Sequence, residues 1–208
     1  MRIIILYLCI FFTTSSFALT INDLQVGDVT LLSLNCIECR MIESETNSLF
    51  SHSGVVVRDE SGRLRIAQSL GKLDHFSIAE FTKNITPKTF VHVYRPREFK
   101  NLTKEQVIAL EKSMLDVFNE TYKHAPFDSA FSWNNFDNQG RELLYCSEFI
   151  AKFLDHFLFM KTQPLPITYT KHADYWLKYF KGKIPLGELG NSPGSFTRDH
   201  RFEFIGTI

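Results

Sequence analysis

Apolar residues recur at intervals of one, three and four positions after Cys146, and this spacing predicts a core-facing helix. The stripe consists of Phe149, Ile150, Phe153, Leu154, Phe157 and Leu158. Positions three and four apart share one face of a helix, so the stripe would be buried. Cys146 therefore lies at the predicted helix N-terminus, where unpaired backbone N–H groups and the positive end of the helix dipole favour a thiolate.

A second helix is predicted to begin after Thr103. The residues from Thr103 to Gln106 form a capping box, in which the first and fourth side chains bond to each other's backbone N–H groups. The inner side of this helix, which extends to about Tyr122, carries Val107, Leu110, Met114, Val117 and Phe118. Residues 37–48 are also compatible with a helix, although a polar one.

Short runs of strand length occupy much of the remaining sequence. They comprise residues 29–34, 53–58, 64–68, 90–94 and 200–208. Turn-forming residues 59–62 separate two of these runs, which predicts a hairpin. Pairing Arg58 with Arg63 places Ser53 opposite Gln68, with a register shift of one or two residues left open. The sequence predicts an α+β fold, with a helical half and an antiparallel sheet half.

Length and composition favour one globular domain over residues 19–208. The whole chain has 208 residues, 44% of them hydrophobic and 22% charged. Residues 1–18 have the pattern of a secretory signal peptide, with Arg2, an apolar run over 3–12 and a small-residue cleavage site at 16–18. The apolar run is too short to span a bilayer, and no later segment is a candidate. We expect an exported protein, periplasmic or secreted.

The charge balance argues against a nucleic-acid partner. The formal net charge is zero, and loss of Arg2 with the signal peptide changes it only to minus one. Phe is abundant, with 20 residues, which indicates an aromatic core and leaves open an apolar groove.

Cys146, His52 and Gln68 are the residues best suited to nucleophilic catalysis. A thiol nucleophile requires a base within hydrogen-bond reach and a third group that orients the base. Cys146 would attack as a thiolate, His52 would accept and return the proton, and Gln68 would orient the imidazole. The backbone N–H of Cys146 is a candidate oxyanion donor, a contact typically worth about 3 kcal/mol of barrier.

Each of these residues also has a structural interpretation. A single cysteine on an apolar helix is often a small buried hydrophobe. His52, between two serines, also suits a turn, and Gln68 suits a strand edge. His92 is the alternative base. The remaining histidines share no metal-ligand spacing and are expected to be structural or exposed: His75, His124, His156, His172 and His200.

Two further groups of residues leave more than one interpretation open. Cys36 and Cys39 follow a predicted strand and open a helix-compatible run, where a local disulfide is favoured over a redox or metal role. No second Cys/His pair of suitable spacing accompanies them to complete a zinc site. Glu43 and Glu45 indicate a solvated helix face, or alternatively a face toward a cationic ligand group.

Several of these motifs together resemble the permuted papain-fold cysteine hydrolases of the YaeF/YiiX type, relatives of the NlpC-like cell-wall peptidases. The similarity covers most of residues 19–208. Its motifs are Gly27-Asp28, Ser51 to Val56, Phe127-Asp128 with Phe131, Tyr145 to Phe149, and Ser192-Pro193. Ordinary papain-like enzymes have the cysteine first, whereas here His52 and Gln68 precede Cys146, which is the order that circular permutation implies.

The resemblance implies a fold in which the cysteine helix packs on a small antiparallel, barrel-like sheet that carries the histidine. It also implies hydrolysis of amide bonds in peptides or peptidoglycan stems without a metal or organic cofactor. Two positions depart from the family pattern. Gln68 stands where the family commonly has Glu, and Phe127 stands where it has an aromatic residue with a hydroxyl. An uncharged Gln68 cannot stabilise an imidazolium by charge, so the expected rate is lower.

The expected function is that of an exported, metal-independent cysteine amidase or peptidase. An alternative is a thiol-dependent lipid acyl hydrolase or acyltransferase, since lipid-modifying relatives share the permuted fold. A second alternative is a non-catalytic ligand-binding protein. The corresponding partners are a peptide, a peptidoglycan fragment or an acylated small molecule, with no nucleic acid and no stable membrane span.

Overall fold

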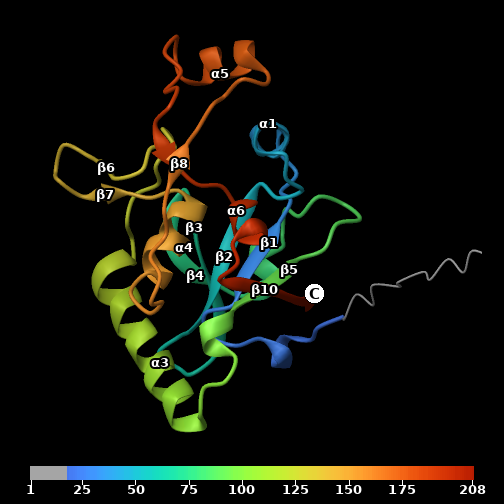
Figure 1. Cartoon of the computed structure of the whole chain (residues 1–208), viewed down its shortest axis with the longest axis vertical. Coiled ribbons are helices and arrows are strands. Elements are labelled where there is room, and N and C mark those ends of the chain that lie inside the picture. Colours follow the sequence, from blue (N-terminus) through green and yellow to red (C-terminus); the bar gives the residue numbers. More distant parts are fainter. Residues whose placement is uncertain (1–17) are drawn as a thin grey trace, which may run out of the picture.

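A six-stranded antiparallel sheet forms the centre of the protein (Figure 1). The computed structural model describes residues 18–208, so the predicted signal peptide, apart from Ala18, lies outside the described residues. The strand order is β10-β5-β1-β2-β3-β4. These strands are β1 (Val29–Leu32), β2 (His52–Arg58), β3 (Leu64–Leu70), β4 (Lys72–Phe76), β5 (His92–Pro96) and β10 (Phe202–Thr207). The predicted α+β class is confirmed, but within residues 18–208 the outer strands β10 and β4 do not pair with each other, so the sheet is not a closed barrel.

Helices and short two-stranded sheets surround this centre. The α-helices are α1 (Ile37–Thr46), α2 (Ile78–Phe81), α3 (Lys104–Val117), α4 (Cys146–Leu154), α5 (Ala173–Tyr179) and α6 (Ser195–Arg198). Short helical turns are η1 (Ile21–Asp23), η2 (Arg97–Phe99) and the π-helical η3 (Phe118–Tyr122). The small sheets pair β6 (Asn135–Phe136) with β7 (Glu142–Leu143), and β8 (Leu165–Pro166) with β9 (Leu189–Gly190). Within residues 18–208, no helix combines the length and apolarity required to cross a bilayer.

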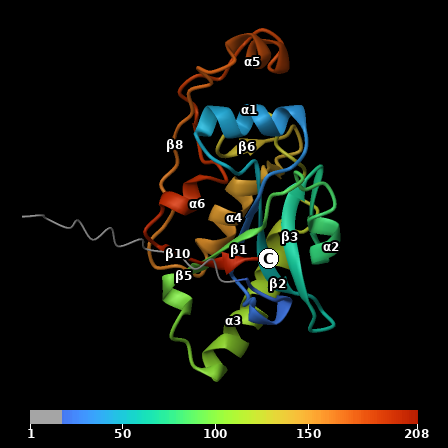
Figure 2. The same ribbon diagram turned by 90° about the vertical axis from the view of Figure 1, so that its right-hand side faces the viewer.

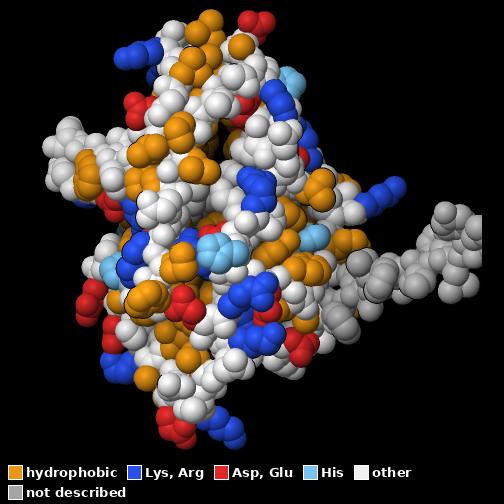
Figure 3. All heavy atoms as spheres, in the orientation of Figure 1, with side chains coloured by type: hydrophobic (Ala, Val, Ile, Leu, Met, Phe, Trp, Pro, Cys, Tyr) orange, Lys and Arg blue, Asp and Glu red, His pale blue; other side chains and the backbone are white. Residues whose placement is uncertain are grey.

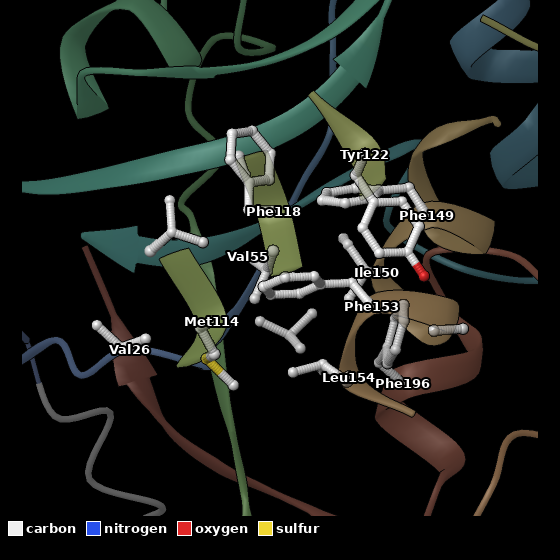
Figure 4. Close-up of a cluster of buried hydrophobic side chains, with 14 of the residues drawn as sticks. Val26, Val55, Met114, Phe118, Tyr122, Phe149, Ile150, Phe153, Leu154 and Phe196 are labelled. Atoms are coloured by element: carbon white, nitrogen blue, oxygen red, sulfur yellow. The ribbon is translucent and has the colours of Figure 1, made fainter. Parts of the chain in front are cut away.

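The helix α4 and the turn η3, which continues α3, pack on one face of the sheet through aromatic side chains (Figure 4). Phe118, Phe149 and Phe153 are fully buried there, and their rings contact one another at centroid distances of 5.6 to 6.4 Å. Fully burying one such side chain typically contributes about 1.5–3 kcal/mol. The apolar stripe predicted after Cys146 is therefore the contact that fixes α4, and its first residue, relative to β2.

The hairpin of β2 and β3 has a register one residue away from the predicted pairing. Arg58 pairs with Leu64 rather than with Arg63, and Val55 pairs with Ala67. Paired residues share a face and successive residues alternate between faces, so a shift of one residue exchanges the two faces. The observed register therefore places Gln68 on the same face as His52, whereas the predicted register had placed it with Ser53.

Gly54 lies on the same face of β2 as His52, next to the apolar side chains of Ile66 and Phe81. A Cβ atom at Gly54 would lie 2.3 Å from a side-chain carbon of Ile66 and 2.9 Å from the ring of Phe81. The ring of His52 contacts Phe81 at a centroid distance of 5.7 Å. The missing side chain at Gly54 thus allows Phe81 to approach the strand and to pack beside the imidazole.

Candidate active site

Cys146 is the first residue of α4 and is only 9% exposed. The side chain of the N-cap residue, Tyr145, makes no capping hydrogen bond. Within residues 18–208, the backbone N–H groups of Cys146, Ser147 and Glu148 have no hydrogen-bond acceptor. Three free donors therefore lie at the positive end of the helix dipole, in the turn that begins with Cys146, and they favour an anion there.

His52 is the first residue of β2 and is 2% exposed. Its Nε2 lies 2.5 Å from the side-chain oxygen Oε1 of Gln68. Because an amide oxygen can only accept a hydrogen bond, Nε2–H is the donor. In the neutral ring, Nδ1 is then the unprotonated nitrogen, and it is the one left to receive the proton of a thiol.

The pKa values of Cys146 and His52 shift in opposite directions. Burial raises the pKa of the Cys146 thiol, but the neighbouring His52 imidazolium and hydrogen bonds from His52 and Ser53 lower it below its ordinary value. Burial lowers the pKa of His52, but the Cys146 thiolate and the hydrogen bonds to Cys146 and Gln68 raise it above its ordinary value. Each charged form therefore stabilises the other, and a thiolate–imidazolium pair is favoured.

The other predicted site residues lie away from this pair. A disulfide bond joins Cys36 and Cys39 at the start of α1. His92, the alternative base, lies in β5, where its ring contacts Phe50 and Phe204 and burial lowers its pKa.

The two acidic residues of α1 have separate partners. Glu43 forms an ion pair with Arg40 at 2.7 Å. The carboxylate of Glu45 accepts backbone hydrogen bonds from Thr170 and Lys171, at 2.7 and 2.8 Å. These bonds hold the segment before α5 against α1, and both views of the ribbon show these two helices at the same end of the molecule (Figures 1 and 2).

Cys146 lines a small, largely apolar cavity of about 60 Å³. Its hydrophobic walls come from Ile42, Phe131, Tyr145, Ile167, Tyr169 and Trp176. A larger cavity of about 400 Å³ adjoins it. The residues that line both cavities are Glu45, Thr46, Ile167, Asn191 and Ser192. The two cavities therefore lie side by side in one recess, with the smaller cavity at the sulfur.

Asn191 holds the wall of this recess against the start of α4. Its backbone N–H donates to the hydroxyl of Tyr145 at 2.9 Å, and its side-chain amide donates to the backbone oxygen of Ser147 at 2.9 Å. A Cβ atom at the preceding Gly190 would lie 2.3 Å from Ile167 and 2.9 Å from the Tyr145 hydroxyl. Asn191 has no sequence signal of its own, although the neighbouring Ser192-Pro193 motif marks this segment.

A buried ion pair lies one turn beyond Cys146. The carboxylate of Glu148 is fully buried, 2.7 Å from the ammonium of Lys152, and accepts the backbone N–H of Asn134 at 3.0 Å. Asn134 and Phe131 both adopt left-handed backbone conformations, with φ of 62° and 53°. Burial raises the pKa of Glu148 to about 7, against the opposing effect of Lys152. Glu148 thus connects α4 to the loop that places Phe131 in the cavity wall.

Comparisons with known proteins identify the fold but not a function. No protein-family model matches the chain, and no curated protein matches it. Among solved structures, the chain is similar to one described as the metalloprotein YiiX from Escherichia coli O157:H7, with a TM-score of 0.71 and 20% sequence identity. The similarity covers 88% of this chain and 97% of that one. The two proteins therefore share an overall fold.

The part of the chain that the structure describes does not provide an evident metal site. Within residues 18–208, no group of three or more His, Cys, Asp or Glu side chains is arranged to hold a metal ion. The Cys146 thiol and the His52 imidazole are both common metal ligands, but within residues 18–208 no third His, Cys, Asp or Glu side chain joins them. The YiiX structure is described as that of a metalloprotein, whereas residues 18–208 of this chain hold no such group of metal-ligating side chains.

Proposed function

We propose that this protein is an exported cysteine hydrolase that cleaves amide bonds through an acyl-thioenzyme at Cys146. One observation carries the proposal: His52 interacts with both Cys146 and Gln68, and the pKa values of the thiol and the imidazole shift toward the charged pair. A buried cysteine that served only packing would not require a base on one side and free N–H groups on the other.

The first half of the reaction forms the acyl-enzyme. The Cys146 thiolate attacks the carbonyl carbon, and the carbonyl oxygen becomes an oxyanion next to the backbone N–H of Cys146. The imidazolium of His52 then donates its Nδ1 proton to the leaving nitrogen as the carbon–nitrogen bond breaks. The product amine leaves, and a thioester remains on Cys146.

The second half regenerates the enzyme. Neutral His52 accepts a proton from a water molecule as the water oxygen attacks the thioester carbon. Collapse of the second tetrahedral intermediate releases a carboxylic acid and returns the thiolate–imidazolium pair. Gln68 acts through His52: its oxygen holds Nε2–H and so keeps Nδ1 directed toward the sulfur.

The proposal includes the relationship to permuted papain-like enzymes. It is supported by the order of His52, Gln68 and Cys146 along the chain and by the YiiX-like fold. The proposed substrates are peptides or peptidoglycan stem fragments.

The apolar walls of the small cavity favour one alternative, a thiol-dependent lipid acyl hydrolase or acyltransferase. Side chains such as Phe131, Ile167 and Trp176 suit an acyl chain as well as an apolar peptide side chain. Both reactions pass through the same tetrahedral oxyanion, so the catalytic residues would be the same.

The test compares substrates in a panel of variants. Purified protein is incubated with muropeptides and, separately, with acyl phospholipids, and the products are identified by mass spectrometry. Turnover of muropeptides that is lost in Cys146→Ser and His52→Ala, with thermal stability retained, supports the amidase. Turnover of phospholipids alone supports the alternative. If both variants keep wild-type turnover, the thiol mechanism is wrong.

A further inference from the structure

We infer that the larger cavity is a subsite for a carboxylate group of the substrate, and that Arg198 binds this carboxylate. The inference rests on the proposed function, because it assigns the part of the substrate that extends away from Cys146. Arg198 is the last residue of α6, is exposed, and lines the cavity of about 400 Å³.

Arg198 is the charged group in this cavity that has no partner. Within residues 18–208, its guanidinium forms no hydrogen bond and no ion pair. Arg201, in contrast, bonds to the carboxylate of Asp199 at 2.6 Å. Glu45 accepts the backbone N–H groups that hold the segment before α5. A guanidinium presents a planar fork of donors that matches a carboxylate, so Arg198 is available for such a ligand.

The larger cavity adjoins the space beside Cys146. Asn191 and Ser192 line both the larger cavity and the space beside Cys146, and Asn191 also bonds to the first turn of α4. A ligand whose carbonyl carbon lies at the sulfur can therefore extend past Asn191 toward α6. The face that carries α6 shows intermixed basic, acidic and hydrophobic side chains rather than one large charged area (Figure 3).

The charges indicate which anion fits. Arg201 is paired with Asp199. Within residues 18–208, this leaves the guanidinium of Arg198 and the carboxylate of Glu45 as the lining charges without an ion pair. The negative charge of Glu45 disfavours a doubly charged phosphate more than a singly charged carboxylate, which Arg198 can still bind. A volume of about 400 Å³ lies within the range of small-molecule sites. We therefore assign the substrate class as a peptide fragment that carries a carboxylate, either on a side chain or at its C-terminus.

The experiment labels Cys146 with matched reagents. Chloroacetyl derivatives of one, two and three glycines are prepared, each with a free carboxylate and as the C-terminal amide. The thiolate displaces chloride, so a carbon–sulfur bond forms as the carbon–chlorine bond breaks. Labelling rates are measured by mass spectrometry of the Cys146 peptide in the wild type, Arg198→Gln and Lys104→Gln. Lys104 is exposed at the start of α3 and lines neither cavity, so it controls for the loss of one positive charge.

For at least one of the three reagent lengths, the wild type should react about ten-fold faster with the free acid than with the amide. Arg198→Gln should remove this preference and keep the rate with the amide, while Lys104→Gln keeps both rates. Equal rates for acid and amide at every length, with Cys146 still more reactive than a free cysteine, would overturn the carboxylate subsite and leave the proposed function standing. A preference that survives Arg198→Gln also overturns it. If Cys146 reacts no faster than free cysteine with any reagent, both the proposed function and the subsite fail.

Discussion

The side-chain oxygen of Gln68 accepts a hydrogen bond from His52 Nε2–H at 2.5 Å, and both residues lie on the same face of the β2–β3 hairpin. This contact fixes which ring nitrogen is protonated. It leaves Nδ1 for the Cys146 thiol, which sets the direction in which the proton moves. Gln68 provides this orientation without a negative charge, so the charge of the imidazolium is balanced chiefly by the thiolate itself.

Two substitutions of Gln68 separate its orienting effect on the His52 ring from the effect of a negative charge beside that ring. Gln68→Ala removes the acceptor, so we expect a decrease in the Cys146 labelling rate and in turnover of about 10- to 100-fold. Gln68→Glu keeps an acceptor and adds a negative charge, which should raise the pKa of His52 further. The pKa of His52 is measured by NMR titration in both variants. An unchanged titration in Gln68→Glu would contradict the assigned contact.

The pH dependence of Cys146 alkylation follows from the lowered pKa of its thiol. Iodoacetamide reacts with the thiolate, so the rate should rise to its plateau at a lower pH than for a free cysteine. His52→Ala removes the imidazolium that lowers this pKa and leaves the opposing effect of burial. The midpoint should then move to higher pH than in the wild type. His92→Ala is the matched control, and its midpoint should remain that of the wild type.

The sequence predicts the position of Cys146 at a helix start more securely than it predicts the residues around it. The apolar stripe after Cys146 predicts a buried helix that begins at the thiol, and α4 begins there. The contact of His52 with Gln68 depends on the hairpin register, which a run of turn-forming residues determines only to within a residue or two. A shift of one residue decided whether Gln68 and His52 share a face.

The walls of the recess were beyond the reach of sequence patterns. Trp176 lies on α5, a helix of seven residues, and Phe131 lies in a turn with a left-handed backbone. Neither has a periodicity that predicts an element. Glu45 appeared to be part of a solvated helix face, but its carboxylate binds backbone N–H groups about 125 positions later in the chain. Such contacts depend on tertiary structure and have no local signature.

The aromatic cluster between α4 and the sheet should dominate stability. Phe153 is fully buried, so Phe153→Ala should lower the free energy of unfolding by about 3–5 kcal/mol, through lost burial and the remaining cavity. Phe159, a few residues later, is 90% exposed. Phe159→Ala should change the free energy by less than about 0.5 kcal/mol. Urea denaturation followed by circular dichroism measures both, and similar losses in the two variants would contradict the position of this core.

The buried carboxylate of Glu148 should make stability depend on pH. Its pKa is raised to about 7 from an ordinary value of 4.5, so the folded state holds a proton that the unfolded chain releases between these two pH values. A raised carboxyl pKa destabilises the fold as the pH rises, because ionisation inside the protein is less favourable than in water. Relative to Glu148→Gln, the wild type should lose about 3 kcal/mol between pH 4.5 and pH 7, and little more above that.

Denaturant unfolding of the two proteins at a series of pH values measures this difference directly. Glu148→Gln keeps an oxygen that can accept the Asn134 N–H, so the variant tests the charge rather than the hydrogen bond. Glu105→Gln, on the exposed first turn of α3, is the control. Its free energy of unfolding should vary with pH almost as that of the wild type does. If the difference between the wild type and Glu148→Gln instead grows in favour of the wild type above pH 4.5, the ion pair with Lys152 outweighs burial, and Glu148 is ionised throughout that range.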